Sequence, residues 1–388
     1  MKKHSLFFVP GIVLVGTVLR IPFTTIPTIL TEVADGLGVS VSSLGILTSI
    51  PLIMFATCSS LAPKLAEKFG LEKLFTMVLL TMVVGSAMRI FNLPALYLGT
   101  MLLGAGIAMM NVLLPSIIQA NQPERVGVLT AVYTTAMGLA SAVASSVAVP
   151  IASATSWKGL ILILSAIVFI AFLIWLPNTT FNHYPKKSQK EQNGSLWKSK
   201  KAWGLLVFGG LQSLMFYTAL TWLPTMATQA GLSAEAAGLL ASIYSLISLP
   251  FSVVVPYLTE KWQGRKRQVA LALVSLSGIL GIALLFFQNA SFTYWLTVNL
   301  LIGVAVSALF PYLLVIYSLK TDTPDQTARL SGMVQSGGYL LAAFGPTLFG
   351  LSFEAFGSWN IALIIWLLLS IVMTAALFYT EKFDKIID

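Results

Sequence analysis

The chain contains twelve apolar stretches, each close to the length that a helix needs to cross a lipid bilayer, which is about 20 residues. Only 10% of its 388 residues are charged and 57% are hydrophobic, whereas soluble domains carry about 25% charged residues. No stretch shows the alternating polarity of a membrane β-strand. The sequence therefore predicts an all-α membrane protein with twelve transmembrane helices, at about 8–34, 43–62, 73–91, 94–119, 126–151, 157–176, 202–229, 236–258, 267–287, 292–318, 327–352 and 358–380.

The basic residues indicate how these helices are oriented. Of the 23 Lys and Arg residues, only Arg20, Arg89 and Lys158 fall outside one set of alternate loops and the termini. The opposite loops carry acidic residues such as Glu32 and Asp35. Because cytoplasmic loops of membrane proteins are rich in Lys and Arg, we expect both termini in the cytoplasm. The net charge of +9 then reflects orientation and not nucleic-acid binding.

Several classes of function lack the residues that they require. The sequence has no Gly-x-x-x-x-Gly-Lys-Ser/Thr loop for nucleoside triphosphates. Its one cysteine, Cys58, and its two histidines, His4 and His183, are too few and too dispersed for a metal site. No nucleophile stands beside a base inside a predicted span. We therefore expect no enzymatic activity, no cofactor and no metal.

A polar segment divides the chain into two related halves. We predict an N-terminal six-helix bundle at 1–177, a basic cytoplasmic linker at 178–201 and a C-terminal six-helix bundle at 202–388. Short motifs recur in the same order in both halves, and the interval from Gly45 to Pro63 equals that from Gly238 to Pro256. Such internal repetition predicts two pseudo-symmetric halves.

A chain of six plus six helices with parallel repeats and a basic central loop resembles the major facilitator superfamily. Glu67, Lys68 and Gly70 stand at the acidic, basic and glycine positions of that family's loop between helices two and three, and Glu260 and Lys261 are their counterparts in the second half. The resemblance implies that these loops take part in gating. It also implies a secondary active transporter whose two halves rock about a central site by alternating access.

Further motifs are similar to those of one branch of this superfamily, the cyanate permeases and 2-nitroimidazole transporters. They are Leu19-Arg20, Met88-Arg89, the segment Asn111 to Pro115, and the segment from Pro123 to Thr135. That branch usually has a proline directly after the first arginine, whereas here Ile21 precedes Pro22. The resemblance implies a cyanate-like anion or a small nitroheterocycle as the substrate, and a bacterial plasma (inner) membrane as the location.

Arg20 is the central candidate for binding that substrate. A charge near the middle of a membrane costs about 2.5 kcal/mol or more, so Arg20 should face protein or a watery cavity. Thr17 and Thr24 follow the same helical spacing, and Pro22 and Pro27 should loosen the helix, which transporters tolerate beside a cavity. No Asp or Glu falls near mid-depth of a span, so a substrate anion is a candidate counter-charge. A structural arginine bound by carbonyls or hydroxyls is the alternative.

The repeat predicts further substrate-binding residues in the second half. The offset that aligns Pro27 with Pro224 also aligns Arg20 with Tyr217, so we expect Tyr217 and Thr221 to bind substrate. Other polar or aromatic side chains within the spans are candidates for the same role, with packing as the alternative for each: Asn111, Tyr133, Thr134, Phe310 and Gln335. Arg89, near the outer end of the third span, is expected to extend to the membrane interface, with an entrance charge as the alternative.

The sequence thus predicts a secondary active transporter for a small polar or anionic solute. Its expected partners are that solute, the lipid bilayer, and protons or a counter-substrate, and we expect a monomer. Importing an anion against the membrane potential costs about 2.3 kcal/mol per 100 mV, whereas export runs downhill, so the direction stays open. The alternatives are a drug or metabolite exporter of the same superfamily for neutral or anionic compounds, an anion channel, and a membrane sensor that transports nothing.

Overall fold

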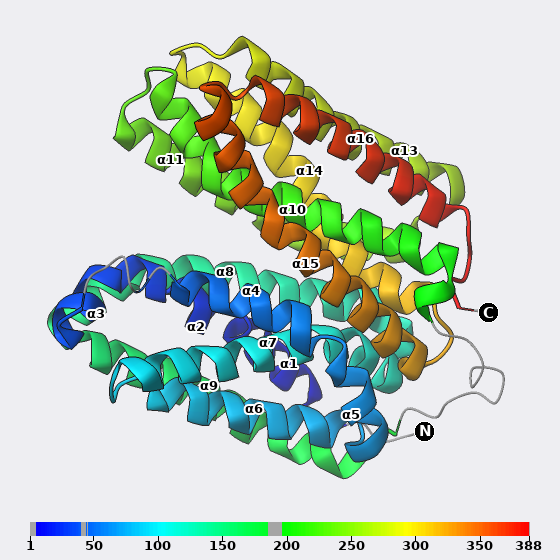
Figure 1. Ribbon diagram of the computed structural model, residues 1–388. Helices are drawn as coiled ribbons and strands as arrows, with labels where there is room; N and C mark the ends of the chain where they lie inside the picture. The colour runs from blue at the N-terminus through cyan, green and yellow to red at the C-terminus, as the bar shows by residue number, and fades with distance from the viewer. Residues whose placement is uncertain (1–4, 40–43, 45, 185–195, 388) are drawn as a thin grey trace. The chain divides into compact units, whose positions relative to one another are not determined.

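The helices form two compact units in the computed structural model, which describes residues 5–39, 44, 46–184 and 196–387 (Figure 1). Unit 1 consists of Met1–Gly194 and Asp322–Gly332, and unit 2 consists of Ser195–Thr321 and Met333–Asp388. The first boundary lies within the predicted linker 178–201. The short segment Asp322–Gly332 comes from the second half of the sequence, but its contacts are with unit 1.

Unit 1 is built from α-helices and short 3-10 helices. In chain order they are α1 (Phe8–Val18), α2 (Ile21–Thr24), η1 (Ile26–Ile29), α3 (Leu30–Leu37), α4 (Ile46–Cys58), α5 (Leu61–Phe69), α6 (Leu71–Met88), α7 (Leu93–Asn121), η3 (Pro123–Arg125), α8 (Val126–Ala154), α9 (Trp157–Trp175) and η4 (Leu176–Phe181).

Unit 2 is also built from α-helices and short 3-10 helices. Its elements are η6 (Leu196–Lys198), α10 (Lys200–Gln229), α11 (Ala234–Leu246), α12 (Ser248–Lys261), α13 (Gly264–Leu284), η7 (Leu285–Phe287), α14 (Phe292–Leu319), most of α15 (Pro324–Phe356) and α16 (Asn360–Glu381). The first turns of α15 belong to unit 1.

Ten helical segments within the described part of the chain are long and apolar enough to cross a membrane. Three predicted spans, 8–34, 43–62 and 236–258, are each divided into shorter helices, although the last, interrupted only at Ile247, still counts among the ten. The twelve predicted spans therefore correspond, in the described residues, to nine continuous helices and three interrupted ones. Pro22 and Pro27 explain the first interruption, because proline has no backbone N–H to donate. In the second span, α4 ends at Cys58 and α5 begins at Leu61.

Side-chain caps set the beginning of several membrane helices. A side-chain oxygen of Asn92, Ser156, Ser199, Ser233 or Ser291 accepts a hydrogen bond from the backbone N–H three residues further on. Each cap satisfies a donor that has no partner inside the helix. The helices α7, α9, α10, α11 and α14 therefore each begin directly after a polar capping residue.

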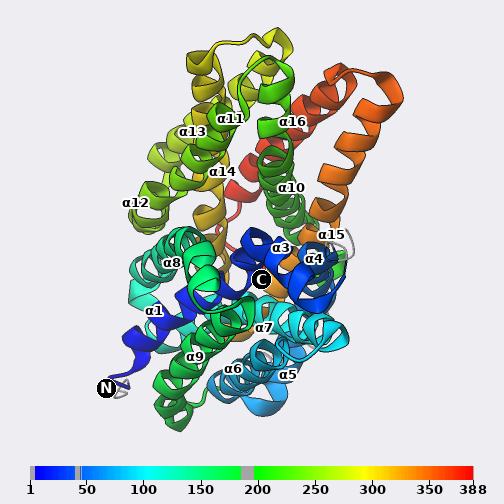
Figure 2. The same cartoon turned by 90° about the vertical axis from the view of Figure 1, so that its left-hand side faces the viewer.

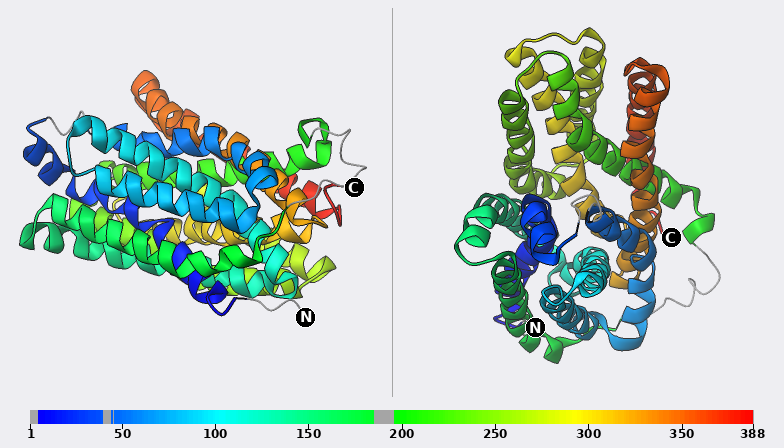
Figure 3. Two further views of the ribbon diagram at one scale, coloured as in Figure 1. Left: turned by 90° about the horizontal axis from the view of Figure 1, so that it is seen from below. Right: turned by 60° about the vertical axis from the view of Figure 1, so that its left-hand side comes forward.

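Within each unit the helices lie side by side (Figures 2 and 3), and small residues allow them to pack closely. In unit 1, α6 lies between α7 and α9, and a Cβ added to Gly99 would lie 2.3 Å from the Gly85 carbonyl oxygen. In unit 2, α10 packs on α14 and α16, and it also approaches α15 closely, since a Cβ on Gly210 would lie 3.0 Å from the Cα of Gly338 on α15. Such close backbone approach is typical of helix packing in membranes.

The first turns of α15 are bound to α7 inside unit 1. The Ser331 hydroxyl donates to the Val112 carbonyl at 2.8 Å. The Ser116 hydroxyl donates to the Pro324 carbonyl, and the Thr327 hydroxyl donates to Gln119 Oε1. These three bonds explain why Asp322–Gly332 groups with the first half of the sequence.

The sequence repeat is visible at two glycines with positive φ. Gly70 follows α5 with φ of 83°, and Gly264 follows Gln263 at the start of α13 with φ of 55°. Positive φ is readily adopted by glycine and costs other residues energy. The two sites differ in their surroundings: a Cβ on Gly70 would lie 2.1 Å from Asn182 Nδ2, whereas nothing lies within 4 Å of a Cβ on Gly264.

This difference predicts unequal effects of the same substitution. Gly264→Ala should cost about 1–2 kcal/mol of stability from its φ alone. Gly70→Ala should cost about 2 kcal/mol more, because the methyl group displaces Asn182, which donates to the Phe69 carbonyl and accepts from the Lys73 amide, each at 3.0 Å. Thermal unfolding of the two purified variants measures the difference, and equal melting temperatures would contradict the packing described for Gly70.

Candidate functional site

Arg20 lies where the first membrane segment of unit 1 is interrupted. The helix α1 ends at Val18, and Arg20 has φ of −121° and ψ of −45°, outside helical geometry, before α2 begins at Ile21. Its backbone N–H donates to the Thr17 carbonyl at 3.3 Å, closing a tight last turn. The side chain is half-buried. The charge predicted for the middle of a span therefore lies at a break in that span.

The contact between α1 and α8 places Tyr133 one turn from this break. A Cβ on Gly16 would lie 2.6 Å from the Tyr133 carbonyl oxygen, so the two backbones touch four residues before Arg20. Tyr133 is 2% exposed. The absence of a side chain at Gly16 brings α8 against the end of α1, as Figure 2 shows for the two helices.

Two predicted threonines already donate their hydroxyl protons within their own helices. The Thr17 hydroxyl donates to the Leu14 carbonyl at 2.6 Å, and the Thr134 hydroxyl donates to the Thr130 carbonyl at 2.8 Å. In this arrangement each hydroxyl has lone pairs left to accept a hydrogen bond, but its proton is not directed at a ligand. Asn111 is half-buried on α7, which packs against α8. The Thr24 side chain lies outside the described residues.

Arg89 has a role that the sequence reasoning did not predict. The residue is 1% exposed, and its guanidinium donates to the Pro22 carbonyl at 3.2 Å and to the Ser86 hydroxyl at 3.4 Å. Ser165 on α9 extends this network by donating to Ser86 at 2.7 Å. The expectation that Arg89 extends to the membrane interface is therefore wrong. It instead binds a backbone carbonyl within the interrupted segment that contains Arg20.

In unit 2, a small pocket brings together two of the predicted residues. Phe310 from α14 and Gln335 from α15 line it together with Ser213, Tyr317 and Tyr339. Its free volume is about 10 Å³, which is room for about one water molecule. The two tyrosines were not predicted, and the signal that could have found them is their helical spacing from Phe310 and Gln335.

The other two predicted residues of unit 2 lie outside this pocket, further along α10. Tyr217 is half-buried one turn beyond Ser213, with its ring centroid 5.3 Å from that of Phe216. Thr221 is exposed one turn further, and its hydroxyl donates to the Tyr217 carbonyl at 2.8 Å. Tyr217 therefore does not share the pocket that contains Phe310 and Gln335.

The loop signature residues occupy helix ends and a tight turn. Glu67 is half-buried, Lys68 is exposed with its ammonium 5.3 Å from the Phe69 ring centroid, and Gly70 forms the turn described above. In the second half, Glu260 is half-buried, and Lys261 is exposed and donates to the Tyr257 hydroxyl. Both loops therefore place a partly buried acid beside an exposed lysine.

A buried acid next to this loop, Glu72, was also missed. It is 0% exposed, and its carboxylate accepts from the Asn121 amide at 2.8 Å, from the His183 backbone N–H at 2.6 Å, and contacts His183 Nδ1 at 2.7 Å. It lies in the first turn of α6, where a negative charge is favoured by the helix dipole. Glu72 therefore fastens the chain that leaves α9 to the start of α6.

Replacing this acid by its amide should destabilise unit 1. Glu72→Gln keeps the size of the side chain, but its amide N–H₂ group then faces the N–H donors of Asn121 and His183. We therefore expect a loss of about 2–3 kcal/mol of stability. Glu124→Gln, on the exposed 3-10 helix η3, is the matched control and should change stability by less than about 0.5 kcal/mol. Thermal unfolding of both variants at neutral pH tests this, and a Glu72 variant as stable as the control would show that the contacts are not important.

Unit 2 also has a buried charge cluster, which lies at the end of α16. The Glu381 carboxylate accepts from Arg267 Nε at 2.8 Å and from the Tyr312 hydroxyl at 2.6 Å, and Lys320 Nζ lies 3.5 Å away. Burial lowers the pKa of Lys320 below its usual value, repulsion from Arg267 adds to this, and the attraction of Glu381 opposes it. These contacts hold α13, α14 and α16 together at the ends that carry the basic loops.

Comparison with known proteins identifies the family of this chain. A model described as the Major Facilitator Superfamily matches residues 11–323 and 224–386. The chain is 34% identical over 379 residues to an uncharacterised transporter, YycB, of Bacillus subtilis, covering 97% of this chain and 93% of that one. It is 33% identical over 377 residues to the 2-nitroimidazole transporter of Escherichia coli, covering 96% and 94%.

Solved structures agree on the fold. The proton:xylose symporter XylE, in its complex with 6-bromo-6-deoxy-D-glucose, superimposes with a TM-score of 0.77 at 16% identity, covering 97% of each chain. At that identity the likeness concerns the fold alone. Together with the family model and the two relatives, it shows that the chain belongs to the major facilitator superfamily, in the branch predicted from its motifs, and is a multi-pass membrane transporter and not an enzyme.

Proposed function

We propose that this transporter moves a small polar or anionic solute, either a cyanate-like anion or a small nitroheterocycle, across the plasma membrane by alternating access. The observation that carries the proposal is the position of Arg20 at the break between α1 and α2. Substrate sites of secondary transporters are typically formed by discontinuous helices near the middle of the membrane. A charged residue retained inside a membrane segment is by default a functional candidate.

The chemistry of arginine fits both kinds of substrate. A guanidinium is planar and presents donors in a fixed fork, which suits paired oxygen acceptors and small anions. A nitro group offers two such oxygens on one nitrogen, and the name of the Escherichia coli relative, a 2-nitroimidazole transporter, supports this substrate class. A cyanate-like anion would add a net charge and bind Arg20 more strongly.

We propose roles for the remaining candidate residues. Arg20 is the principal donor, and in unit 2 Tyr217, Phe310 and Gln335 contribute donors and an aromatic wall. Thr17, Thr134 and Thr221 donate to backbone carbonyls, so we assign them the weaker role of acceptors. Asn111, Tyr133 and Thr24 complete the set, and Glu67, Lys68, Gly70, Glu260 and Lys261 act in gating.

The orientation and coupling of the transporter also remain proposals. We propose that both termini face the cytoplasm, because the basic loops lie on the same side as the termini. We also propose that the protein works as a monomer in the inner membrane and that uptake is coupled to protons or to a counter-substrate. A downhill export mode needs no such coupling. Transport assays in proteoliposomes can distinguish coupled uptake from downhill export.

Transport assays in proteoliposomes test the proposed function. We expect uptake of labelled cyanate or a nitroimidazole to saturate with concentration and to accelerate at least about threefold when the vesicles are preloaded with the same unlabelled compound. Such acceleration is expected of a carrier that must reorient its site. Linear, non-saturating flux that ignores preloading would instead indicate a channel, and binding without any flux would indicate a sensor.

A further inference from the structure

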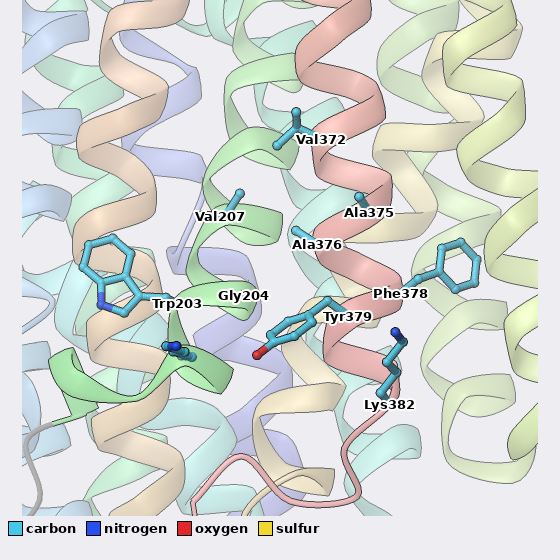
Figure 4. Close-up of a pocket in the computed structure, with 10 residues that line it drawn as sticks. Trp203, Gly204, Val207, Val372, Ala375, Ala376, Phe378, Tyr379 and Lys382 are labelled. Atoms are coloured by element: carbon cyan, nitrogen blue, oxygen red, sulfur yellow. The ribbon is translucent and has the colours of Figure 1, made fainter.

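A groove on unit 2 has the shape and charge of a lipid-binding site and lies away from the candidate substrate residues. It runs between the first turns of α10 and the last turns of α16, two helices that pack side by side (Figure 4). Its volume is about 690 Å³, within the usual range of about 300–1,000 Å³ for small-molecule sites.

Small side chains create this groove. A Cβ on Gly204 would lie 2.6 Å from Cδ1 and 3.0 Å from Cε1 of the Tyr379 ring, so only glycine leaves the ring in its present position. On α16, Ala375 and Ala376 face the same space, and Val207 and Val372 extend it away from the basic end (Figure 4). The result is an apolar channel open along one side.

Aromatic and basic residues surround one end of this channel. Trp203 and Tyr379 line it and are 43% and 36% exposed, which is typical of aromatic residues at a membrane interface. Lys200 and Lys382 line the same end and are both exposed. From Val372 to Lys382 the helix rises about 15 Å, so the groove is apolar along about half the thickness of a bilayer core and ends in two positive charges.

The nearby carboxylates do not cancel these charges. Glu381 precedes Lys382, but its carboxylate is bound to Arg267 at 2.8 Å and to Tyr312 at 2.6 Å, on the inner side of α16. Asp384 is exposed two residues after Lys382, whereas Lys198 and Lys201 lie beside Lys200 in the sequence. The end of the groove therefore stays positively charged.

We propose that this groove binds an anionic phospholipid from the leaflet that faces the basic loops. One acyl chain lies along the channel formed by Gly204, Val207, Val372 and Ala375, and the phosphodiester binds Lys200 and Lys382. Basic pockets between membrane helices on the cytoplasmic side are suited to anionic headgroups, and lysine stems can lie along apolar surface while their ammonium groups reach the headgroup. The proposal is independent of the transported substrate and of Arg20.

Native mass spectrometry of the purified full-length protein tests this site. Phosphatidylglycerol and phosphatidylcholine with identical acyl chains are titrated separately, and inorganic phosphate serves as the headgroup without chains. We expect one phosphatidylglycerol to bind at least tenfold more tightly than phosphatidylcholine, and inorganic phosphate to show no comparable binding. Equal affinity for the two lipids, or binding of inorganic phosphate as tight as that of phosphatidylglycerol, would overturn the proposal.

Two kinds of variant separate the headgroup from the chain contacts. The double variant Lys200→Gln/Lys382→Gln should weaken the binding of phosphatidylglycerol about 30-fold, since each lysine near a headgroup raises the affinity about fivefold. Gly204→Leu should fill the channel and weaken the binding of both lipids, although the two lysines remain. The matched control is Arg265→Gln/Lys266→Gln, which removes two exposed charges at the start of α13 and should leave both affinities unchanged. Equal losses in the control and the lysine variant would show that only overall charge attracts the lipid.

Discussion

Replacing Arg89 by alanine is expected to destabilise unit 1 more than any other single substitution considered. The change removes the donor to the Pro22 carbonyl at 3.2 Å and to Ser86 at 3.4 Å, and it empties the space of a side chain that is 1% exposed. Loss of a buried charged donor together with its packing should cost about 3–5 kcal/mol. For a unit of about 200 residues this corresponds to a fall in melting temperature on the order of 10 °C.

Thermal unfolding of the purified variant measures this effect. Arg125→Ala removes an exposed arginine from η3 and should change stability by less than about 0.5 kcal/mol, so it controls for the loss of charge. Arg89→Lys should have an intermediate effect, because an ammonium group can reach one acceptor but lacks the fork of donors. If Arg89→Ala melts at the same temperature as Arg125→Ala, the contact with Pro22 does not stabilise the interrupted segment.

The second large effect is expected on transport and not on stability. Arg20→Gln should weaken substrate binding about 100-fold, because a charge-assisted hydrogen bond in a partly dry site contributes about 2–3 kcal/mol and each 1.4 kcal/mol changes affinity tenfold. The side chain is half-buried, so the melting temperature should change by no more than about 5 °C. Concentration dependence of uptake in proteoliposomes gives the apparent affinity.

Matched variants make this result interpretable. Arg20→Lys keeps the charge and should retain part of the affinity, and more of it for a monoatomic or linear anion than for a nitro group that uses two donors. Arg125→Gln removes an exposed arginine and should leave the apparent affinity unchanged. An Arg20→Gln variant that transports with the affinity of the unchanged protein would place Arg20 among the structural residues.

Much of the fold follows from hydropathy, because a bilayer demands long apolar helices with satisfied backbones. That demand located the ten segments that are long and apolar enough to cross a membrane, and the prolines at positions 22 and 27 indicated where the first span would be interrupted. Hydropathy says less about the second span, where α4 ends at Cys58, since neither a glycine nor a proline stands at the break.

The side-chain contacts were harder to predict than the helices. Arg20 could be singled out because a charge in an apolar run is conspicuous by itself. Arg89 binds a carbonyl 67 residues away and Glu72 binds His183 at a separation of 111 residues. Nothing local in the sequence encodes either pair, because each depends on how helices pack. Arg89 was therefore expected at the interface, and Glu72 was overlooked beside Glu67, which matches the loop motif.

The central claim is that Arg20 binds the substrate, and ligand-induced stabilisation tests it most directly. A ligand that binds the folded protein raises its melting temperature by mass action. We would measure this shift for cyanate, nitrate, nitrite, formate and 2-nitroimidazole, with the unchanged protein and with Arg20→Gln. The account predicts that at least one anion or the nitroimidazole stabilises the unchanged protein and not the variant. Equal stabilisation of both proteins by the same compound would contradict it.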